Sequence, residues 1–218
     1  MKYMVDSADV RAIKKINEYY PISGVTTNPS LVFEAGRDLK TLIREIREII
    51  GSEKMLHVQT LSLKAKDIVA EAGRIVDFAG PNTYVKIPVT PEGMKAIMAV
   101  KAQGIGVTAT AIFTPQQALM AATAGADFVA PYINRLDNIA VNGVEIAGQI
   151  ADLLRTAGSP CEVLAASFNN IEQIHMTSLH GVGVVTISPK MFEKIIYHPL
   201  TDIAVEDFVA KGKDLYNI

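Results

Sequence analysis

Short apolar runs recur along the whole chain, and each is followed by a longer amphipathic segment. The runs are rich in β-branched residues and end at glycine, proline or polar residues, so they predict β-strands. Eight such runs occur, at intervals of roughly 25 residues. The predicted strands span residues 2–6, 22–26, 55–60, 83–87, 107–111, 128–132, 162–166 and 184–187.

The segments between these strands carry apolar residues at helical spacing. Leu39, Leu42, Ile43 and Ile46, for example, mark one face of a helix. The predicted helices span residues 8–20, 39–50, 63–79, 92–101, 115–124, 144–156, 171–179, 190–197 and 201–216, and another begins at Asn28 and Pro29.

This alternation predicts one α/β domain over residues 1–218. Near-continuous apolar strands are typical of a parallel sheet covered on both faces. Eight strand–helix units predict a single-domain (β/α)8 barrel, a TIM barrel, with an additional C-terminal helix at residues 201–216. An open doubly wound sheet, which usually has fewer strands, is the main structural alternative.

The composition of the chain excludes several classes of protein. Hydrophobic residues make up 49% of the chain and the net charge is −2, so we expect a sizeable core and no binding to nucleic acid or membranes. The single cysteine, Cys161, allows no intrachain disulfide and fits a reducing compartment. The uncharged residues 102–126 contain Pro115 and read as strand, turn and helix rather than as a membrane span. Acidic residues interrupt the N-terminus before any signal-peptide core, so a cytoplasmic protein is expected.

Lys86 is out of place in its predicted apolar strand. Side chains alternate along a strand, so Tyr84 and Lys86 share one face while Val85 and Ile87 share the other. If both faces are covered, burial lowers the pKa of the lysine toward the nucleophilic free amine that Schiff-base chemistry requires. Two other readings remain open: an edge strand with Lys86 in water, or a buried carboxylate that neutralises it.

Polar residues end seven of the eight predicted strands. In a (β/α)8 barrel the carboxyl ends of the strands and the loops after them form the reactive face. Ordinary turn and helix-cap chemistry explains any one of these residues, but together they would surround Lys86 with hydrogen-bonding groups. The set comprises Asp6, Thr26 with Asn28, Gln59, Lys86, Thr110, Tyr132 with Arg135, and Ser167.

The types of these side chains predict an aldol reaction. A neutral Lys86 amine can attack a ketone and form an iminium that accepts electrons. Asp6 would stabilise the iminium, and Tyr132 would move protons through a water held by Gln59 and Thr110. A structural salt bridge or N-cap is the alternative for Asp6, and a core aromatic role is the alternative for Tyr132.

Four other side chains are predicted to bind substrate. Asn28 would contact its hydroxyl groups, and Thr26, at the end of the preceding strand, is a further candidate for binding substrate. Arg135 and Ser167 suit a phosphate group, helped by helix N-termini on the same face. Arg135 paired with Asp137 on the surface is the alternative for that residue.

The histidines do not predict a metal site. His175 and His180 are five residues apart, which is off the spacing of two ligands on one helix face. We expect neither a metal nor a cofactor. His57 shares strand parity with Gln59, so it faces the barrel lumen if that parity holds, where packing is its expected role.

Four motifs together resemble the transaldolase family, and in particular its short branch of small transaldolases and fructose-6-phosphate aldolases. They are Gly24-Val-Thr-Thr-Asn-Pro-Ser30, Val85-Lys-Ile-Pro-Val89, Ala130-Pro-Tyr-Ile-Asn-Arg135 and Leu164-Ala-Ala-Ser-Phe168. The resemblance implies a (β/α)8 class I aldolase with its Schiff-base lysine at Lys86 and its catalytic carboxylate at Asp6. It also implies sugar-hydroxyl binding at Asn28, water binding at Gln59 and Thr110, and phosphate binding at Arg135 and Ser167.

Two positions discriminate within the family. Transaldolases of this group typically carry Glu where this chain has Gln59 and Phe where it has Tyr132, and the fructose-6-phosphate aldolases resemble this chain at both. We therefore expect reversible cleavage of fructose 6-phosphate to dihydroxyacetone and glyceraldehyde 3-phosphate. The alternatives are a transaldolase of the pentose phosphate pathway and, more remotely, a non-catalytic sugar-phosphate-binding barrel. The resemblance also implies a homo-oligomer, a pentamer or decamer, in which the C-terminal helix reaches a neighbouring subunit.

Overall fold

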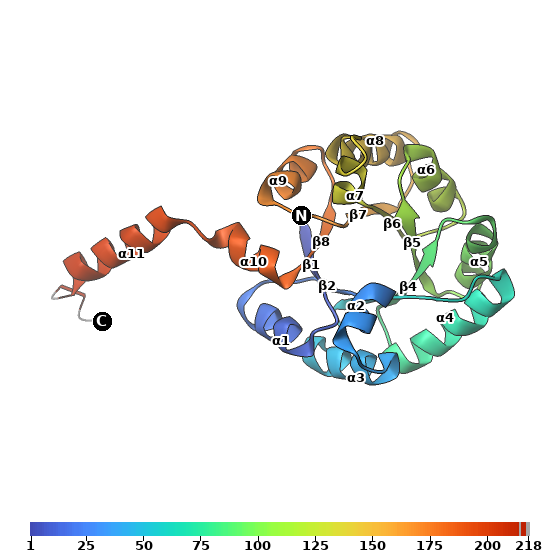
Figure 1. Cartoon of the computed structure of the whole chain (residues 1–218), viewed down its shortest axis with the longest axis horizontal. Helices are drawn as coiled ribbons and strands as arrows, with labels where there is room; N and C mark the ends of the chain where they lie inside the picture. The colour runs from blue at the N-terminus through green and yellow to red at the C-terminus, as the bar shows by residue number, and fades with distance from the viewer. Residues whose placement is uncertain (214, 217–218) are drawn as a thin grey trace.

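The computed structural model describes residues 1–213, 215 and 216 as a closed barrel of eight parallel strands, joined in the order of the sequence and surrounded by helices (Figure 1). The predicted (β/α)8 barrel is confirmed, and the open doubly wound sheet is excluded. The strands are β1 Lys2–Asp6, β2 Gly24–Thr26, β3 Met55–Gln59, β4 Thr83–Pro88, β5 Gly106–Ile112, β6 Phe128–Pro131, β7 Glu162–Ala165 and β8 Val184–Ile187.

The helices lie close to their predicted positions, with four larger differences. They are α1 Val10–Tyr19, α2 Pro29–Ala35, α3 Leu39–Ile50, α4 Ala65–Ala79, α5 Pro91–Ala102, α6 Pro115–Thr123, α7 Ile133–Asp137, α8 Gly143–Thr156, α9 Ile171–Leu179, α10 Pro189–Ile196 and α11 Pro199–Gly212. The short α7 was not predicted, because five residues are too few to show a helical period. The predicted starts of α1, at residue 8, and of α4, at residue 63, are each two residues early.

The last helix also differs from its prediction. Pro199 was expected to precede this helix, but it occupies the first turn, where a missing N–H costs nothing. The ring nitrogen Nδ1 of His198 accepts the backbone N–H of Leu200, 3.2 Å away, and caps the helix. The helix ends at Gly212, and residue 214 of the predicted range 201–216 lies outside the described residues.

Alternating strand side chains divide the core into two layers. Outward-facing Val, Ile and Ala pack against the surrounding helices in one large cluster. A smaller cluster fills the lower part of the lumen and contains Met4, Phe128, Leu164 and Val184. Gly106 makes room in this layer, since a Cβ atom there would lie 2.7 Å from Cδ1 of Tyr84. The lumen below the carboxyl ends of the strands is therefore a packed floor, not a channel.

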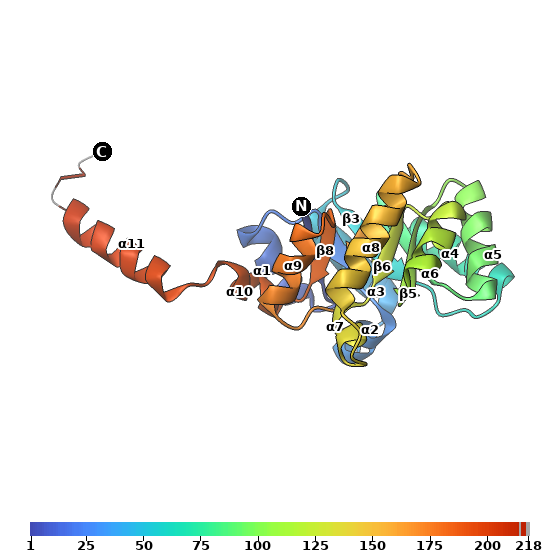
Figure 2. The same ribbon diagram turned by 90° about the horizontal axis from the view of Figure 1, so that it is seen from above.

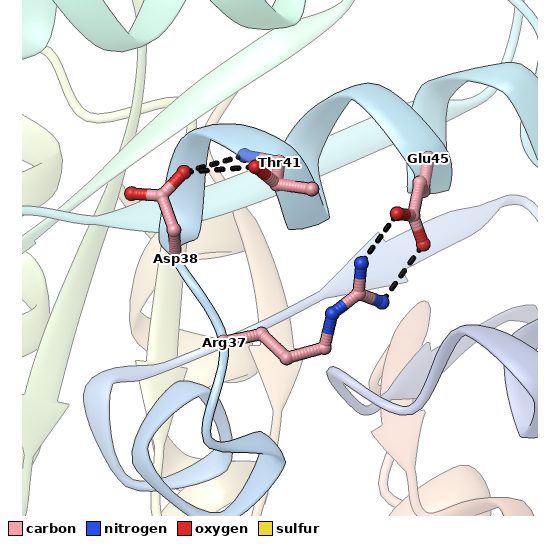
Figure 3. A network of polar contacts seen from close by, with 4 residues as sticks. All are labelled: Arg37, Asp38, Thr41 and Glu45. Atoms are coloured by element: carbon pink, nitrogen blue, oxygen red, sulfur yellow. Dashed lines mark hydrogen bonds and ion pairs between the residues drawn. The ribbon is translucent and has the colours of Figure 1, made fainter.

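The segment that follows β2 is held by contacts at the corner between α2 and α3 (Figure 3). Asp38 caps α3 by accepting the N–H of Thr41 at 2.9 Å, and the Arg37 guanidinium forms a bidentate ion pair with Glu45. Because these groups are exposed and screened by water, the ion pair contributes little to the free energy of unfolding. The pair ties the end of the α2 segment to α3.

The helix α11 extends away from the barrel in two perpendicular views (Figures 1 and 2). It carries several exposed apolar side chains, among them Leu200, Ile203, Phe208 and Val209. Among the residues that the structure describes, no helix combines the length and the apolar character that crossing a bilayer requires.

Candidate active site

A cavity of about 400 Å³ opens at the carboxyl ends of the strands. Seven of the nine predicted site residues line it, and they come from β1, β3 and β4 and from the segments that follow β2, β6 and β7. The lining residues are Asp6, Asn28, Pro29, Ser30, Gln59, Lys86, Ala111, Phe113, Tyr132, Arg135, Ala166 and Ser167. The other two, Thr26 and Thr110, are fully buried just beneath it and hydrogen-bond to Asp6 and Tyr132.

Lys86 lies inside the barrel with 5% of its surface exposed. Closure of the barrel leaves β4 paired on both sides, so the edge-strand explanation of this residue is wrong. Its amine donates to the backbone carbonyl of Thr27 at 2.9 Å, and within the described residues it joins no carboxylate in a direct ion pair. Burial lowers the pKa of Lys86, while the charge of Asp6 acts in the opposite direction. The amine is therefore biased toward its neutral, nucleophilic form.

The Asp6 carboxyl group stands at the end of β1, half-buried in the same cavity. Burial raises its pKa, and the Lys86 charge and a hydrogen bond from Thr26 offset part of that rise. The Thr26 hydroxyl donates to Oδ1 of Asp6 at 2.6 Å and lies 2.6 Å from the hydroxyl of Thr186. Because Thr26 has a single proton to donate, Thr186 must be the donor in the second bond. This chain of hydroxyl groups orients the carboxylate, which suits a group that accepts and returns a proton.

Thr26 therefore differs from its predicted role as a substrate contact. It has no exposed surface, and its hydroxyl is directed to Asp6. Thr26 therefore orients the Asp6 carboxylate, and its hydroxyl is not free to contact a molecule in the cavity.

The Tyr132 hydroxyl lies 2.9 Å from the hydroxyl of Thr110 at the rim of the cavity. Tyr132 follows β6 and pairs with Ala166 in an isolated bridge, so it marks the join between β6 and α7. Its ring also meets Phe113 edge-on, with the centroids 5.6 Å apart. The hydroxyl is thus held by Thr110 and the ring by Phe113, in a side chain that lines the cavity.

Two residues of the cavity wall have left-handed backbone conformations. Ala111 has φ of 59° and Ser167 has φ of 64°, values that cost a non-glycine residue on the order of 1 kcal/mol. At Ala111 the pairing of β5 with β6 shifts register between Ala109 and Ile112. A bulge of this kind re-aims neighbouring side chains, here Thr110 and Phe113.

Arg135 and Ser167 line one side of the cavity together. Arg135 lies on α7, with its guanidinium carbon 4.7 Å from the centre of the Tyr132 ring. Asp137 does not pair with it: its two carboxylate oxygens accept from Gly143 N at 2.8 Å and from Gln173 Nε2 at 2.5 Å. The surface ion pair considered for Arg135 is therefore absent from the part of the chain described, and the cation faces the cavity.

Asn28 and Gln59 form the opposite wall. The Asn28 side-chain oxygen caps α2 by accepting the N–H of Leu31 at 3.1 Å, so its NH2 group is the part that can donate to a substrate oxygen. Gln59 pairs in register with Lys86 on the neighbouring strand. Both side chains thus line the same cavity as Lys86.

His57 faces the lumen, as its strand parity predicts, but it lies below the cavity and does not line it. Its ring stacks on Tyr84 with centroids 4.8 Å apart, and Nδ1 lies 2.8 Å from the hydroxyl of Thr108. Burial and the charge of Lys86 hold the pKa of His57 well below its usual range. A neutral imidazole here forms part of the floor beneath the amine.

Three features of the site were not predicted. The carbonyl of Thr27 has no side-chain signal, and nothing in an alanine reveals the positive φ of residue 111. Thr186 gave only a weak signal: it is the one hydroxyl residue of the apolar strand β8, but threonine is common in strands.

The barrel and its cavity together define a class of protein: a (β/α)8 barrel with a desolvated lysine, a half-buried carboxyl group and a cationic side wall at the reactive face. No group of three or more His, Cys, Asp or Glu side chains that could hold a metal ion occurs in residues 1–213, 215 and 216.

Comparisons with known proteins give the particular family. The protein-family model described as Transaldolase/Fructose-6-phosphate aldolase matches residues 3–216 of this chain. The chain is 41% identical over 218 residues to a probable transaldolase of Agathobacter rectalis, covering 99% of each chain. It is 38% identical over 209 residues to a probable fructose-6-phosphate aldolase of Streptococcus pneumoniae, covering 95% of this chain and 94% of that one. The chain belongs to the transaldolase/fructose-6-phosphate aldolase family, as its motifs indicate.

A solved structure shows the same fold at greater distance. A mutant mandelate oxidase superposes with a TM-score of 0.59 at 16% identity, covering 86% of this chain and 63% of that chain. The likeness concerns the barrel alone.

Proposed function

We propose that this family member is a Schiff-base aldolase that reversibly cleaves fructose 6-phosphate into dihydroxyacetone and glyceraldehyde 3-phosphate. The observation that carries the proposal is the Tyr132 hydroxyl, which shares the cavity with the buried Lys86 amine and lies 2.9 Å from Thr110. A proton donor at this place allows the three-carbon fragment to leave as a free ketone.

The first half of the reaction uses Lys86 and Asp6. The neutral Lys86 amine adds to the substrate ketone, and loss of water gives a protonated Schiff base. Asp6, whose pKa is raised by burial, takes the proton from the hydroxyl group beside the breaking carbon–carbon bond. The bonding electrons move into the Schiff base, leaving an enamine on Lys86 and releasing the aldehyde.

The second half decides between the two activities of the family. In an aldolase, Tyr132 delivers a proton to the enamine carbon through a water held by Gln59 and Thr110, and hydrolysis then frees dihydroxyacetone and Lys86. Asn28 donates to the hydroxyl groups of the bound fragment, and Arg135 with Ser167 holds the phosphate of the aldehyde. No cofactor takes part in these steps.

A transaldolase is the alternative, favoured by the name of the relative from Agathobacter rectalis. Fructose 6-phosphate supplied alone distinguishes the two, since an aldolase releases dihydroxyacetone without an acceptor. Turnover that requires an added acceptor such as erythrose 4-phosphate, with the three-carbon unit transferred to it and no free dihydroxyacetone formed, would replace the aldolase with a transaldolase.

A non-catalytic sugar-phosphate-binding barrel is the remaining alternative. Borohydride reduction in the presence of substrate should leave a covalent adduct on Lys86, identified by peptide mass spectrometry. Binding of fructose 6-phosphate without any adduct would rule out both enzymatic functions.

We also propose that the protein assembles into a homo-oligomer through α11, whose exposed Ile203 and Phe208 would pack on a neighbouring subunit. Phe208→Glu is expected to lower the mass in solution toward that of one chain, 23.5 kDa, because a buried carboxylate would oppose the contact. Glu206→Gln, on the same exposed helix, is the matched control. Size-exclusion chromatography with light scattering measures both, and a wild-type mass of one chain would contradict the proposal.

A further inference from the structure

Gln173 lies outside the cavity, in the first turn of α9, and is buried. Its amide oxygen accepts the backbone N–H groups of Asn169 at 2.7 Å and Asn170 at 3.3 Å, in a capping box. Those two donors fix the orientation of the amide, so its NH2 group must point the other way. It points to α7.

The NH2 group of Gln173 holds one face of α7. It donates to Oδ2 of Asp137 at 2.5 Å and to Oδ1 of Asn134 at 3.3 Å. Asn134 and Asp137 are three residues apart and therefore share a face of the helix. A helix of five residues has little stability of its own, so its rotation about its axis depends on such contacts.

Arg135 lies on a different side of the same short helix. It follows Asn134 by one residue, which turns it by about 100° from the clamped face. There it packs over the Tyr132 ring and lines the cavity with Ser167, whose carbonyl accepts the N–H of Asn134 at 2.7 Å. Clamping Asn134 and Asp137 against α9 thus directs Arg135 toward the cavity.

We propose that Gln173 is a positioning residue that fixes the rotation of α7 and thereby aims Arg135 at the phosphate group of a sugar phosphate substrate. The inference rests on the function proposed above and deepens it. Gln173 touches neither the Lys86 amine nor the cavity. A change at Gln173 should therefore alter the binding of the phosphate and leave the chemistry at Lys86 unchanged.

The first test is Gln173→Met, which removes the clamp without changing any charge. The Michaelis constant for glyceraldehyde 3-phosphate as acceptor of dihydroxyacetone is expected to rise about tenfold, the equivalent of about 1.4 kcal/mol. The turnover number should hold, and so should both constants for unphosphorylated glyceraldehyde, because only binding of the phosphate is lost. Glu172→Gln, an exposed change in the same turn of α9, is the matched control and should alter neither substrate.

The second test exchanges the two partners. Gln173→Glu keeps an oxygen for the capping box but sets a carboxylate against Asp137, so it should raise the same Michaelis constant. Adding Asp137→Asn returns a donor to the pair and restores the wild-type net charge. The double variant should recover the constant for glyceraldehyde 3-phosphate to within about twofold.

Two results would overturn the inference. Equal losses on phosphorylated and unphosphorylated acceptors would mean that Gln173 serves only to stabilise the fold. An unrestored constant in a folded double variant would mean that the hydrogen bond to Asp137 does not aim Arg135. A wild-type protein that forms no Lys86 adduct with borohydride would instead overturn the proposed function, and this inference with it.

Discussion

Replacement of Lys86 by methionine is expected to abolish turnover of fructose 6-phosphate, with a loss of roughly 10⁴-fold or more in the turnover number. Methionine has about the volume of lysine but no nucleophile, so no Schiff base can form. The borohydride adduct should disappear together with the activity.

The same variant should fold at least as well as the wild type. The buried Lys86 amine has one hydrogen bond, to the Thr27 carbonyl, and its burial opposes its charged form. An apolar side chain of similar size removes that cost, so the midpoint of thermal unfolding should stay the same or rise.

The matched control for Lys86 is Lys66→Met, which removes an exposed amine from α4 and should leave both adduct and turnover intact. Activity in Lys86→Met comparable to wild type would refute the assignment of the nucleophile. A collapse of the thermal midpoint in that variant would mean that the buried amine stabilises the fold, contrary to expectation.

Replacement of Tyr132 by phenylalanine is expected to slow release of free dihydroxyacetone by about 100-fold. This is the low end of the rate loss that follows removal of a general acid. The ring remains, so its contacts with Phe113 and Arg135 are kept. Only the hydroxyl is lost, and with it the proton for the enamine. Transfer of the three-carbon unit to an added aldehyde needs no such proton and should persist.

This variant would thus behave as a transaldolase. Parallel assays with fructose 6-phosphate alone and with erythrose 4-phosphate added measure the two outcomes. Tyr19→Phe, which removes an exposed hydroxyl from α1, serves as the control. Release of dihydroxyacetone by the Tyr132 variant at the wild-type rate would show that another group protonates the enamine.

The fold followed from the sequence because it depends on local patterns. Short runs rich in Val and Ile that end at turn residues predict strands, and the helical spacing between them needs no knowledge of distant residues. The same locality made Lys86 visible, since a charge inside an apolar strand stands out against its immediate neighbours. The polar strand ends were visible for the same reason, and the barrel brought them to one cavity.

The errors at the site have the opposite origin. Thr26 turned out to serve Asp6 because Thr186, 160 residues away in sequence, completes its hydrogen bonds. The position of Arg135 depends on Gln173, which lies on another helix and has no spacing relationship to it. Such pairings are set by the packing of whole elements.

By itself the sequence determined the eight strands, the family and the place of Lys86 at the reactive face. Only the tertiary structure decided that this lysine is desolvated, because burial requires the closing of β1 against β8. It also decided that Asp137 turns away from Arg135, and that Ala111 and Ser167 hold left-handed backbones. The physical reason is common to these cases: the charge state of an amine and the direction of a side chain depend on neighbours that the chain supplies from far away.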